Sequence, residues 1–449
     1  MKDVKIIYTE EGLKNIKSNC PSCGSTDIVY NPKTNKLNCN YCRKTFEPKE
    51  LNNIKDLNLL DKTIIGSGAK DITSNENIIT VKCSSCGAEV VIDTSKTTYA
   101  KCHWCRNILS INNRIENGSV PDAILPFKVT KEEAIEEINK FVSERSKYAL
   151  PKFKKEFKAE DVQGVYLPYL LADAKIKCSY EGRGVKELLT YKTEDGDIRC
   201  NKEIYDIQRE FNLNIDDLSI ESEKNSNNKN VIKTNNIINS IMPFDTNNCI
   251  KYESNYLIGY TSEKRNININ EVSNEVEEMK KDIINSLVND TANKYNKGIK
   301  WNKSEIHEEG SQWMAAYLPV WLYTYKEKVN GKEIVHFIAL NGRTKKIMGS
   351  IPINNNKILR EYLTLELSWI LLTTLLYLFL DYYILILLLF MIPITWYYDS
   401  KIEKYRNAKA RYNHKKDTRK IVNYKTNKDE LYETIMGEII DPNNKGFYE

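Results

Sequence analysis

The sequence has few of the residues and motifs on which common enzyme chemistries depend. It contains four histidines in 449 residues, and no two of them are spaced as a pair of metal ligands. His307, in the segment HEEG, has no second histidine one helical turn later, which excludes a zinc-peptidase helix. The segment GSGAK at 66–70 lacks the spacing of a phosphate-binding loop. We therefore predict no catalytic residue and no cofactor-binding residue, and we expect a protein that is not an enzyme.

Long apolar runs are absent from most of the chain, with one exception. Residues 369–398 are largely apolar, and Asp381 is the only charge among them. As one helix this stretch would be about 45 Å long, against a bilayer core of about 30 Å, and it would bury Asp381 near the bilayer centre. Two helices that turn at Asp381 avoid both problems. The sequence thus predicts a transmembrane hairpin at 360–398, with a buried soluble hairpin as the alternative.

Targeting and charge patterns bear on where the two ends of the chain lie. Residues 1–8 are short and charged, and do not have the pattern of a signal peptide. The net charge is only +5, but positive residues are concentrated in 401–425, directly after the apolar stretch. Positive flanks favour the cytoplasmic side of a membrane. We expect a cell-membrane protein with both termini in the cytoplasm, and a basic tail at 399–449 that lies against membrane lipids.

Cysteine spacing indicates metal sites rather than disulfides. Eight of the eleven cysteines form four C-x-x-C pairs, and the same spacing of C-x2-C-x15-C-x2-C occurs twice. Zn²⁺ prefers four thiolates in a tetrahedron, and a redox dithiol would not need two matched sets. The predicted ligands of two structural Zn²⁺ ions are Cys20, Cys23, Cys39 and Cys42 for the first, and Cys83, Cys86, Cys102 and Cys105 for the second. His103 lies inside the second set, but the four thiols already complete the coordination shell.

The central part of the chain shows two segments of similar order. ILPFKV at 124–129 precedes a helix pattern with a capping box, Thr130 with Glu133, and then the strand pattern GVYLPYLLAD. Later, IMPF at 241–244 precedes a second helix pattern and then AAYLPVW. The two Tyr-Leu-Pro stretches, 166–168 and 317–319, therefore occupy equivalent places. We predict a duplicated α+β domain whose strands form an antiparallel sheet.

Turn signals and composition complete this outline. Asn-Gly pairs at 330–331 and 341–342 are typical of hairpin turns. Aromatic residues near the Tyr-Leu-Pro stretches, Tyr169, Trp313 and Trp321, suit core packing better than a ligand groove. The predicted units are a first zinc ribbon at 1–45, a linker at 46–80, a second ribbon at 81–112, the α+β domain at 118–356 with an Asn-rich linker at about 221–236, the hairpin at 360–398 and the tail at 399–449.

Together these motifs resemble those of a known family. The tandem ribbons, ILPFKV before a helix, GVYLPYLLAD and the late apolar segment are similar to bacterial TFIIB-type zinc-ribbon membrane proteins, sometimes labelled primosomal helicase-like. No nucleotide-binding motif supports the helicase label. The resemblance covers nearly the whole chain, although the Asn-rich inserts are looser. It implies a membrane anchor of the kind that, in bacilli, acts with a flotillin-like zinc-ribbon protein and phage-shock-protein-A.

The predicted fold class is α+β, with two N-terminal β zinc ribbons, the duplicated domain and a C-terminal transmembrane α-helical hairpin. The predicted function is a non-enzymatic, membrane-anchored zinc scaffold that presents these domains to cytoplasmic or membrane proteins, with a role in membrane stress. A membrane-tethered nucleic-acid-binding protein for transcription or replication is the alternative. Aromatic residues that would favour it are Tyr30, Tyr41, Tyr99 and Trp104. Acidic residues that weaken a positive surface are Glu10, Glu11, Asp27 and Glu89.

Overall fold

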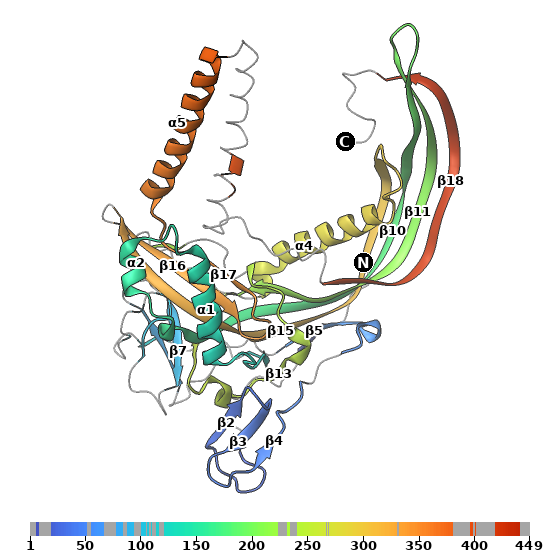
Figure 1. The fold of residues 1–449 in the computed structure, drawn as a ribbon. Helices are drawn as coiled ribbons and strands as arrows, with labels where there is room; N and C mark the ends of the chain where they lie inside the picture. The colour runs from blue at the N-terminus through green and yellow to red at the C-terminus, as the bar shows by residue number, and fades with distance from the viewer. Residues whose placement is uncertain are drawn as a thin grey trace.

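A computed structural model describes most of the chain. The described residues are 6–8, 19–51, 55–66, 78–83, 88–93, 100–104, 106, 109, 114–115, 121–222, 231–233, 240–265, 267, 269–329, 332–379, 396–397, 400 and 418–440. A broad body carries two projections (Figure 1). Helix α5 (Asn355–Phe379) rises from one end of the body, and a curved arm of long strands rises from the other.

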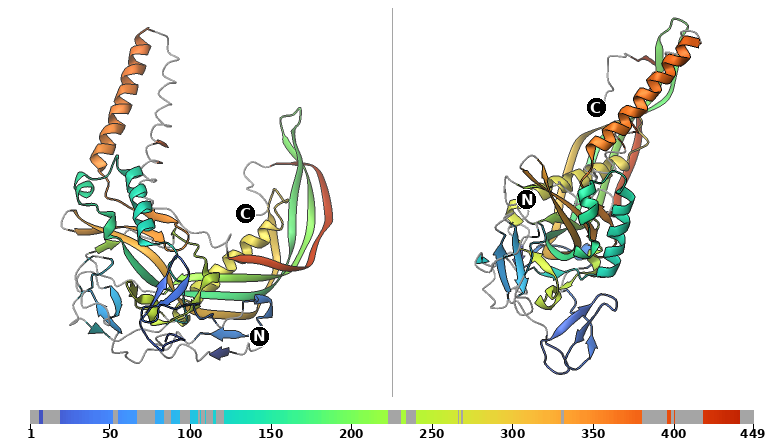
Figure 2. Two further views of the ribbon diagram at one scale, coloured as in Figure 1. Left: turned by 60° about the horizontal axis from the view of Figure 1, so that its bottom comes forward. Right: turned by 60° about the vertical axis from the view of Figure 1, so that its left-hand side comes forward.

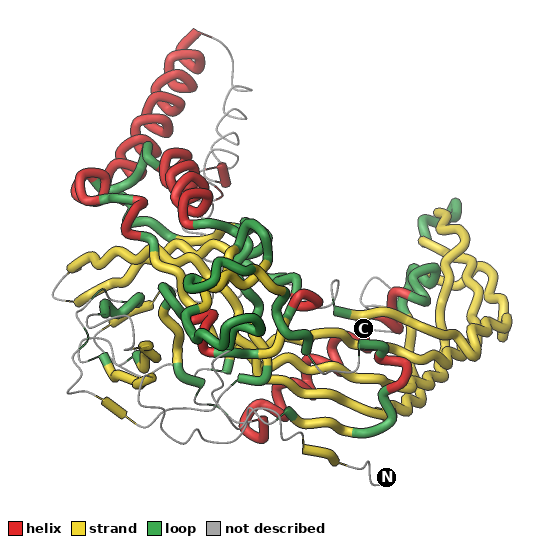
Figure 3. The backbone as a smooth tube through the Cα atoms, turned by 90° about the horizontal axis from the view of Figure 1, so that it is seen from below, coloured by secondary structure: helices red, strands yellow, loops and turns green. Residues whose placement is uncertain are grey.

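Long antiparallel strands form the centre of the fold. Across the sheet their order is β16, β15, β10, β11 and β18. β10 and β15 run through both the body and the arm, whereas β16 lies in the body and β18 in the arm (Figure 1). Figure 3 shows the long strands side by side from below. Their bounds are β10 Gln163–Lys192, β11 Ile198–Glu221, β15 Ile299–Val329, β16 Lys332–Asn341 and β18 Arg419–Ile439. In β10, residues 164–173 are buried on both faces, and burial then alternates from Ala174 onwards. The first part of β10 is therefore a core strand with layers on both sides, and the second part has one covered face.

Short strands extend this sheet. Within the described residues it has 15 strands, and a separate small sheet has three. The short members of the large sheet are β1 Ile6–Tyr8, β5 Thr63–Ile65, β6 Ile78–Lys82, β7 Glu89–Asp93, β8 Arg114–Ile115, β9 Ala123–Ile124, β12 Val231–Lys233, β13 Ile250–Lys251, β14 Thr261–Glu263 and β17 Ile347–Gly349. The small sheet consists of β2 Ile28–Asn31, β3 Lys36–Cys39 and β4 Thr45–Phe46.

Two helices pack against the body and one against the arm. Helices α1 (Lys131–Arg145) and α2 (Pro151–Glu156) lie on the body, whereas α4 (Ile269–Asp290) runs along the arm (Figure 2). The predicted capping box of α1 is confirmed: the Glu133 N–H donates to Thr130 Oγ1, and the Thr130 N–H donates to the Glu133 carboxylate. The buried residues of α1 are Ala134, Ile138, Phe141 and Val142. Those of α4 include Val272, Val276, Ile283, Ile284 and Val288, which pack against the apolar residues of β11.

An approximate two-fold symmetry relates the two halves of the body. The Tyr-Leu-Pro stretches pair with each other, Leu167 opposite Leu318, in antiparallel β10 and β15. Each stretch also has a short parallel neighbour, since Ile124 of β9 lies opposite Tyr317 and Ser262 of β14 lies opposite Tyr166. Ile124 and Ser262 each lie seven residues before the first residue of a helix, Lys131 of α1 and Ile269 of α4. An internal duplication would produce this arrangement, with β14 rather than IMPF as the counterpart of β9.

The predicted fold class is wrong, because it expected more helix and less β-sheet than the structure has. The described chain is mostly β-sheet, with four α-helices, and not an α+β domain joined to separate units. Within the second predicted ribbon, β7 pairs with β14 and so joins the large sheet. Residues 419–439, predicted to belong to a basic tail, form β18 and pair with β11. Sequence patterns indicated the strand starts but not strands of 30 and 31 residues, the lengths of β10 and β15.

The predicted transmembrane hairpin is also contradicted. Among the residues that the structure describes, no helix combines the length and the apolar character that a membrane span needs. In α5, Glu361 and Glu366 interrupt the apolar run, and the described part after Glu366 would be only about 20 Å long. Asp381, the proposed turn, lies outside the described residues. The prediction of a cell-membrane protein with two spans and cytoplasmic termini is therefore not upheld.

Candidate metal centre and neighbouring sites

Four cysteines of the first ribbon converge on one point. Sγ atoms of Cys20, Cys23, Cys39 and Cys42 all lie within 4.8 Å of one another. The Cys20 and Cys42 sulfurs are 3.5 Å apart, and those of Cys23 and Cys39 are 3.7 Å apart. Separations of this size suit four thiolates around one tetrahedral ion. The predicted ligand set of the first ribbon is thus brought together, and it can hold a metal ion.

Two similar backbone turns hold the cysteine pairs. In the first turn the Gly24 N–H donates to the Cys20 carbonyl, and in the second the Arg43 N–H donates to the Cys39 carbonyl. Both Gly24 and Arg43 have positive φ, +75° and +63°. Glycine adopts this conformation readily, but arginine does so at a cost. The second turn thus accepts backbone strain to place Cys39 and Cys42 correctly.

Backbone amides favour the thiolate form of two of these ligands, Cys20 and Cys39. The Cys42 N–H points at the Cys39 sulfur at 3.5 Å, and this contact lowers the Cys39 pKa. Burial raises the pKa of Cys20, but the N–H groups of Ser22 and Cys23, together with the neighbouring thiols of Cys42 and Cys23, outweigh it and bring the pKa to about 6. Because a thiolate is the form that binds metal, these contacts prepare Cys20 and Cys39 for a cation. At Cys23 the Ser25 N–H lowers the pKa, but burial and the other three thiols outweigh it and raise the pKa.

The ribbon is docked on the body by specific contacts. Asn255 Nδ2 donates to the carbonyls of Thr26 and Ile28, at 3.3 and 3.5 Å. Tyr30 packs against Tyr256, with ring centroids 5.5 Å apart. The Lys49 ammonium also lies 2.8 Å from the buried carboxylate of Glu253. The four-cysteine cluster is therefore fixed relative to the large sheet.

Half of the second predicted ligand set is described. Cys83, which directly follows β6, and Cys102 are both buried. Cys86 and Cys105 lie outside the described residues, so the described chain shows one four-cysteine cluster and not two. His103, which was not predicted as a ligand, makes other contacts. Its Nε2 lies 3.1 Å from a carboxylate oxygen of Glu263, and its Nδ1 lies 3.4 Å from the Thr261 hydroxyl.

These contacts attach the second cysteine segment to the large sheet. Both His103 and Glu263 are buried, and the indole N–H of Trp104 donates to the same carboxylate. The Tyr317 hydroxyl donates to the Glu263 carbonyl at 3.1 Å. Sequence reasoning missed this contact residue, Glu263, because the segment TSEK matches no motif.

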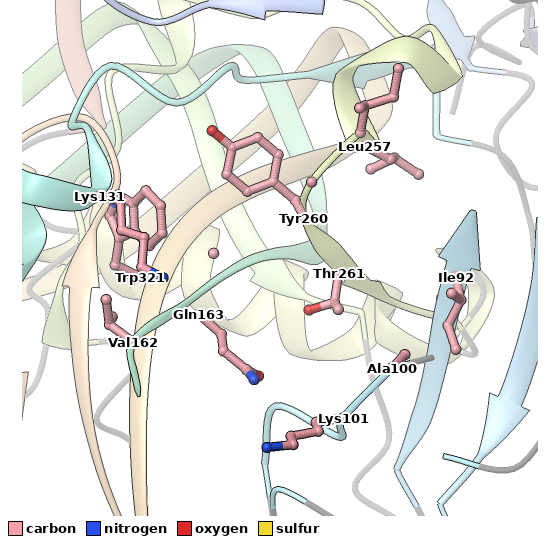
Figure 4. A pocket seen from close by; sticks show the side chains of 13 residues that line it. Ile92, Ala100, Lys101, Lys131, Val162, Gln163, Leu257, Tyr260, Thr261 and Trp321 are labelled. Carbon is pink, nitrogen blue, oxygen red and sulfur yellow. The ribbon is translucent and has the colours of Figure 1, made fainter. Parts of the chain in front are cut away.

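A cavity of about 570 Å³ lies between this segment and the body (Figure 4). Lys131 and Trp321 lie on one side of it, and Ile92 and Ala100 on the other. The carbonyl oxygen of the Gln163 side chain is buried here and has no hydrogen-bond partner among the described residues. An ammonium group, an aromatic wall and a buried acceptor suit a small organic molecule that carries an anionic group and a donor.

One of the three aromatic residues predicted to pack in the core, Trp321, also lines this cavity. Trp321 contributes to the cavity wall, but it is almost fully buried and its indole N–H donates to the Val129 carbonyl. Tyr169 and Trp313 are buried in the core clusters on the two faces of the sheet. Core packing, the favoured alternative, therefore describes Tyr169 and Trp313. Trp321 packs in the core and also lines the cavity.

A second group of possible metal ligands is acidic. Carboxylates of Asp173, Asp216 and Asp217 lie within 4.8 Å of one another, where irregular pairing interrupts β10 and β11. The Asp217 N–H donates to Asp173 at 2.7 Å, and Gln312 donates to the other oxygen. Burial raises the pKa of Asp173 well above its usual range, and that of Asp217 to about 6. A proton shared between these carboxylates explains their close approach just as well as a bound cation would.

The predicted base-stacking residues are mostly not accessible. Tyr30 and Trp104 are buried, and Tyr99 lies outside the described residues. Tyr41 is 80% exposed in the turn between Cys39 and Cys42. Of the acidic residues, Glu89 lies near Lys82 and Lys264. Glu10 and Glu11 are outside the described residues.

Comparison with known proteins gives one distant relative. The chain is similar to an uncharacterized protein of Bacillus subtilis (strain 168), YdjG, with 24% identity over 345 residues. The aligned region covers 76% of this chain and 92% of the relative. No protein-family model matches the chain. No solved structure matches it either.

Proposed function

We propose that this protein is a non-enzymatic zinc-binding scaffold that docks other proteins. The observation that carries the proposal is the four-cysteine cluster, held on the body by Asn255 and Glu253. Four cysteines complete the preferred shell of Zn²⁺ and leave no position for a reacting water. A metal centre of this kind stabilises a small unit and contributes no chemistry. The second set, Cys83, Cys86, Cys102 and Cys105, is proposed to hold a second Zn²⁺.

The exposed tip of the first ribbon is the proposed docking surface. Tyr41, Arg43 and Lys44 form this tip, and all three side chains are exposed. A tyrosine on a rigid turn can enter a partner at low entropic cost, and arginine is enriched at protein interfaces. The partners that the family resemblance implies, a flotillin-like protein and phage-shock-protein-A, are the first candidates.

A nucleic-acid-binding function is the second candidate, because the same tip combines an exposed aromatic ring with positive charge. The described ribbon offers only one accessible aromatic residue for stacking, and Asp27, Glu47 and Glu50 reduce its positive charge. Non-specific nucleic-acid binding depends on neutralising several phosphates, so this surface is expected to bind weakly.

The two functions are separated by measuring both ligands on one preparation of the full chain. Binding to purified phage-shock-protein-A and to short duplex and single-stranded DNA and RNA is measured at about 0.15 M salt, where screening is physiological. We expect protein binding that Tyr41→Ala with Arg43→Glu weakens, and nucleic-acid binding weaker than about 100 µM. Lys152→Glu, on exposed α2, is the control. Micromolar binding to nucleic acid with a steep salt dependence, without protein binding, would contradict the scaffold proposal.

A further inference from the structure

β18 is a long strand at the edge of the sheet. It is 21 residues long, and among the described strands it pairs only with β11. It forms the outermost strand of the arm (Figure 1). Its second edge therefore presents a row of backbone N–H and C=O groups that no described strand covers. Such an edge is a template for another strand.

Exposed apolar side chains alternate with charged ones along this edge. Exposed large hydrophobic residues of β18 are Val422, Tyr424, Leu431, Tyr432, Met436 and Ile439. Isolated edge strands normally carry charged residues and few apolar ones, because apolar edges aggregate. Burial of these side chains by a neighbouring strand would stabilise the arm.

Charge is separated by sign along β18. The basic residues Arg419, Lys420, Lys425 and Lys428 all precede the acidic residues Asp429, Glu430, Glu433 and Glu438. No acidic residue occurs in the first half, and no basic residue in the second. An antiparallel strand with the same sequence would place each basic half beside an acidic half. The strand is thus complementary to a second copy of itself.

Three of these charged residues, Lys420, Lys428 and Glu430, lie on the face of the sheet away from α4, whereas Arg419 and Asp429 lie on the α4 face. In β11, Phe211 and Leu213 pack against α4. The even-numbered β11 positions in this region point away from α4. Among them, Asn214 lies opposite Lys420 of β18, Gln208 opposite Lys428, and Asp206 opposite Glu430. A two-fold axis perpendicular to the sheet keeps this face continuous between copies. With the axis at Asp429, the facing pairs are Lys420 with Glu438, Lys425 with Glu433, and Lys428 with Glu430, each occurring twice.

The register shifts in the pairing of β18 with β11 are also distributed around Asp429. Its pairing with β11 shifts register at four places. In β18 these shifts fall within 421–423, 424–426, 431–433 and 435–438. Two shifts lie on each side of Asp429 at similar distances, so antiparallel copies would place irregular stretches next to each other. Asp429 itself is paired within its own chain, with Arg209 and Lys294. Two Asp429 side chains across the axis would therefore each be neutralised.

We propose that two copies of this chain pair through antiparallel β18 strands centred on Asp429, so that one sheet continues through both arms. The interface is isologous, as expected of a two-fold symmetric dimer. Main-chain hydrogen bonds supply the contact, and the Lys–Glu pairs set its register.

Two charge-reversal variants test the dimer. The first carries Lys420→Glu, Lys425→Glu and Lys428→Glu, and the second carries Glu430→Lys, Glu433→Lys and Glu438→Lys. Sedimentation velocity of the full chain over a concentration series measures self-association. We expect wild-type dimers, and a rise of at least about tenfold in the dissociation constant of each variant alone, because every facing pair becomes repulsive. An equimolar mixture should regain dimers, since the two variants again have opposite charges.

The mixture separates loss of the interface from loss of folding, because misfolded chains would not associate when combined. Lys152→Glu with Lys154→Glu and Lys155→Glu, on exposed α2, changes the net charge by the same amount as the first variant and should leave the dimer unchanged. A wild-type chain that stays monomeric would overturn the proposal and leave the edge to a strand of another protein. Dimers that neither variant weakens, or a mixture that stays monomeric, would also overturn it.

Discussion

Leu167 and Leu318 lie opposite each other where β10 and β15 cross the centre of the body, with Tyr166 facing Pro319 and Pro168 facing Tyr317 on either side. Both leucines are fully buried in the same core cluster. The two halves of the body meet at this pair, and each half supplies a short parallel strand and a helix around it. β10 and β15 continue from this centre into the arm.

Truncation at this centre should affect the two halves equally. We expect Leu167→Ala and Leu318→Ala each to lower the free energy of unfolding by about 2–5 kcal/mol, because each leaves a cavity in a closely packed core. Leu189→Ala, at an exposed position of the arm, should change it by less than about 0.5 kcal/mol. Denaturant titration of the purified chain provides the measurement. A cost at one leucine but not at the other would contradict the symmetric role.

Removal of one ligand should release one metal ion. Cys39→Ser is expected to lower the bound zinc by about one equivalent per chain, since a four-thiolate site loses most of its affinity with one ligand. Amide hydrogen exchange of residues 26–46 should rise at the same time. Cys200→Ser, in β11 and away from both cysteine sets, should leave the zinc content unchanged. Equal zinc content in Cys39→Ser and wild-type protein would show that the first cluster is not the site.

Docking of the ribbon should depend on Asn255 and not on the metal. Asn255→Ala removes the donor to Thr26 and Ile28, and a lost hydrogen bond of this kind costs about 1 kcal/mol. We expect faster hydrogen exchange at residues 26–31 with the zinc content unchanged. Asn248→Ala, whose partner is the nearby Asp245, is the matched control. Unchanged exchange in Asn255→Ala would mean that the aromatic contact of Tyr30 with Tyr256 suffices.

The buried acidic cluster predicts a specific pH dependence. Burial raises the pKa of Asp217 from its ordinary 3.8 to about 6, so the folded chain keeps a proton that the unfolded chain loses. The stability of the wild-type protein should therefore fall as the pH rises from about 4 to about 6, and the loss is complete above that range. Asp217→Asn removes this loss, and asparagine tolerates the φ of +49° found there.

Thermal unfolding across this pH range tests the prediction. Above pH 6 the Asp217→Asn variant should melt a few degrees higher than the wild-type protein, and the difference should vanish near pH 4. Asp195→Asn, in an exposed turn, should show no such difference. A variant that melts lower at neutral pH would indicate that the Asp217 carboxylate is stabilised in the fold, as a bound cation would do.

Local patterns in the sequence predicted local structure well. The capping box at Thr130 and the turn after Asn341 depend on a few neighbouring residues, and both are present. The first cysteine set also follows from spacing alone, because two short turns bring all four thiols together. The Asn330–Gly331 turn lies outside the described residues.

Features that depend on distant partners could not be predicted in this way. β18 has charged residues that are typical of a solvated tail, and its strand conformation depends on pairing with β11, more than 200 residues earlier. Similarly, β14 is recognised as the counterpart of β9 only through its pairing with Tyr166, since the residues Thr261–Glu263 do not resemble Ala123–Ile124. For the apolar stretch after Trp369, hydropathy alone predicted a membrane span. The described helix in this region, α5, does not combine the length and apolar character of a span.

X-ray absorption at the zinc edge identifies the atoms bound to the metal. If Cys20, Cys23, Cys39 and Cys42 close the coordination shell of a structural Zn²⁺ ion, purified full-length protein contains zinc with four sulfur neighbours at about 2.3 Å. No oxygen or nitrogen is then expected in the first shell. A shell that contains a light-atom ligand, or a folded chain that binds no zinc, would contradict this assignment.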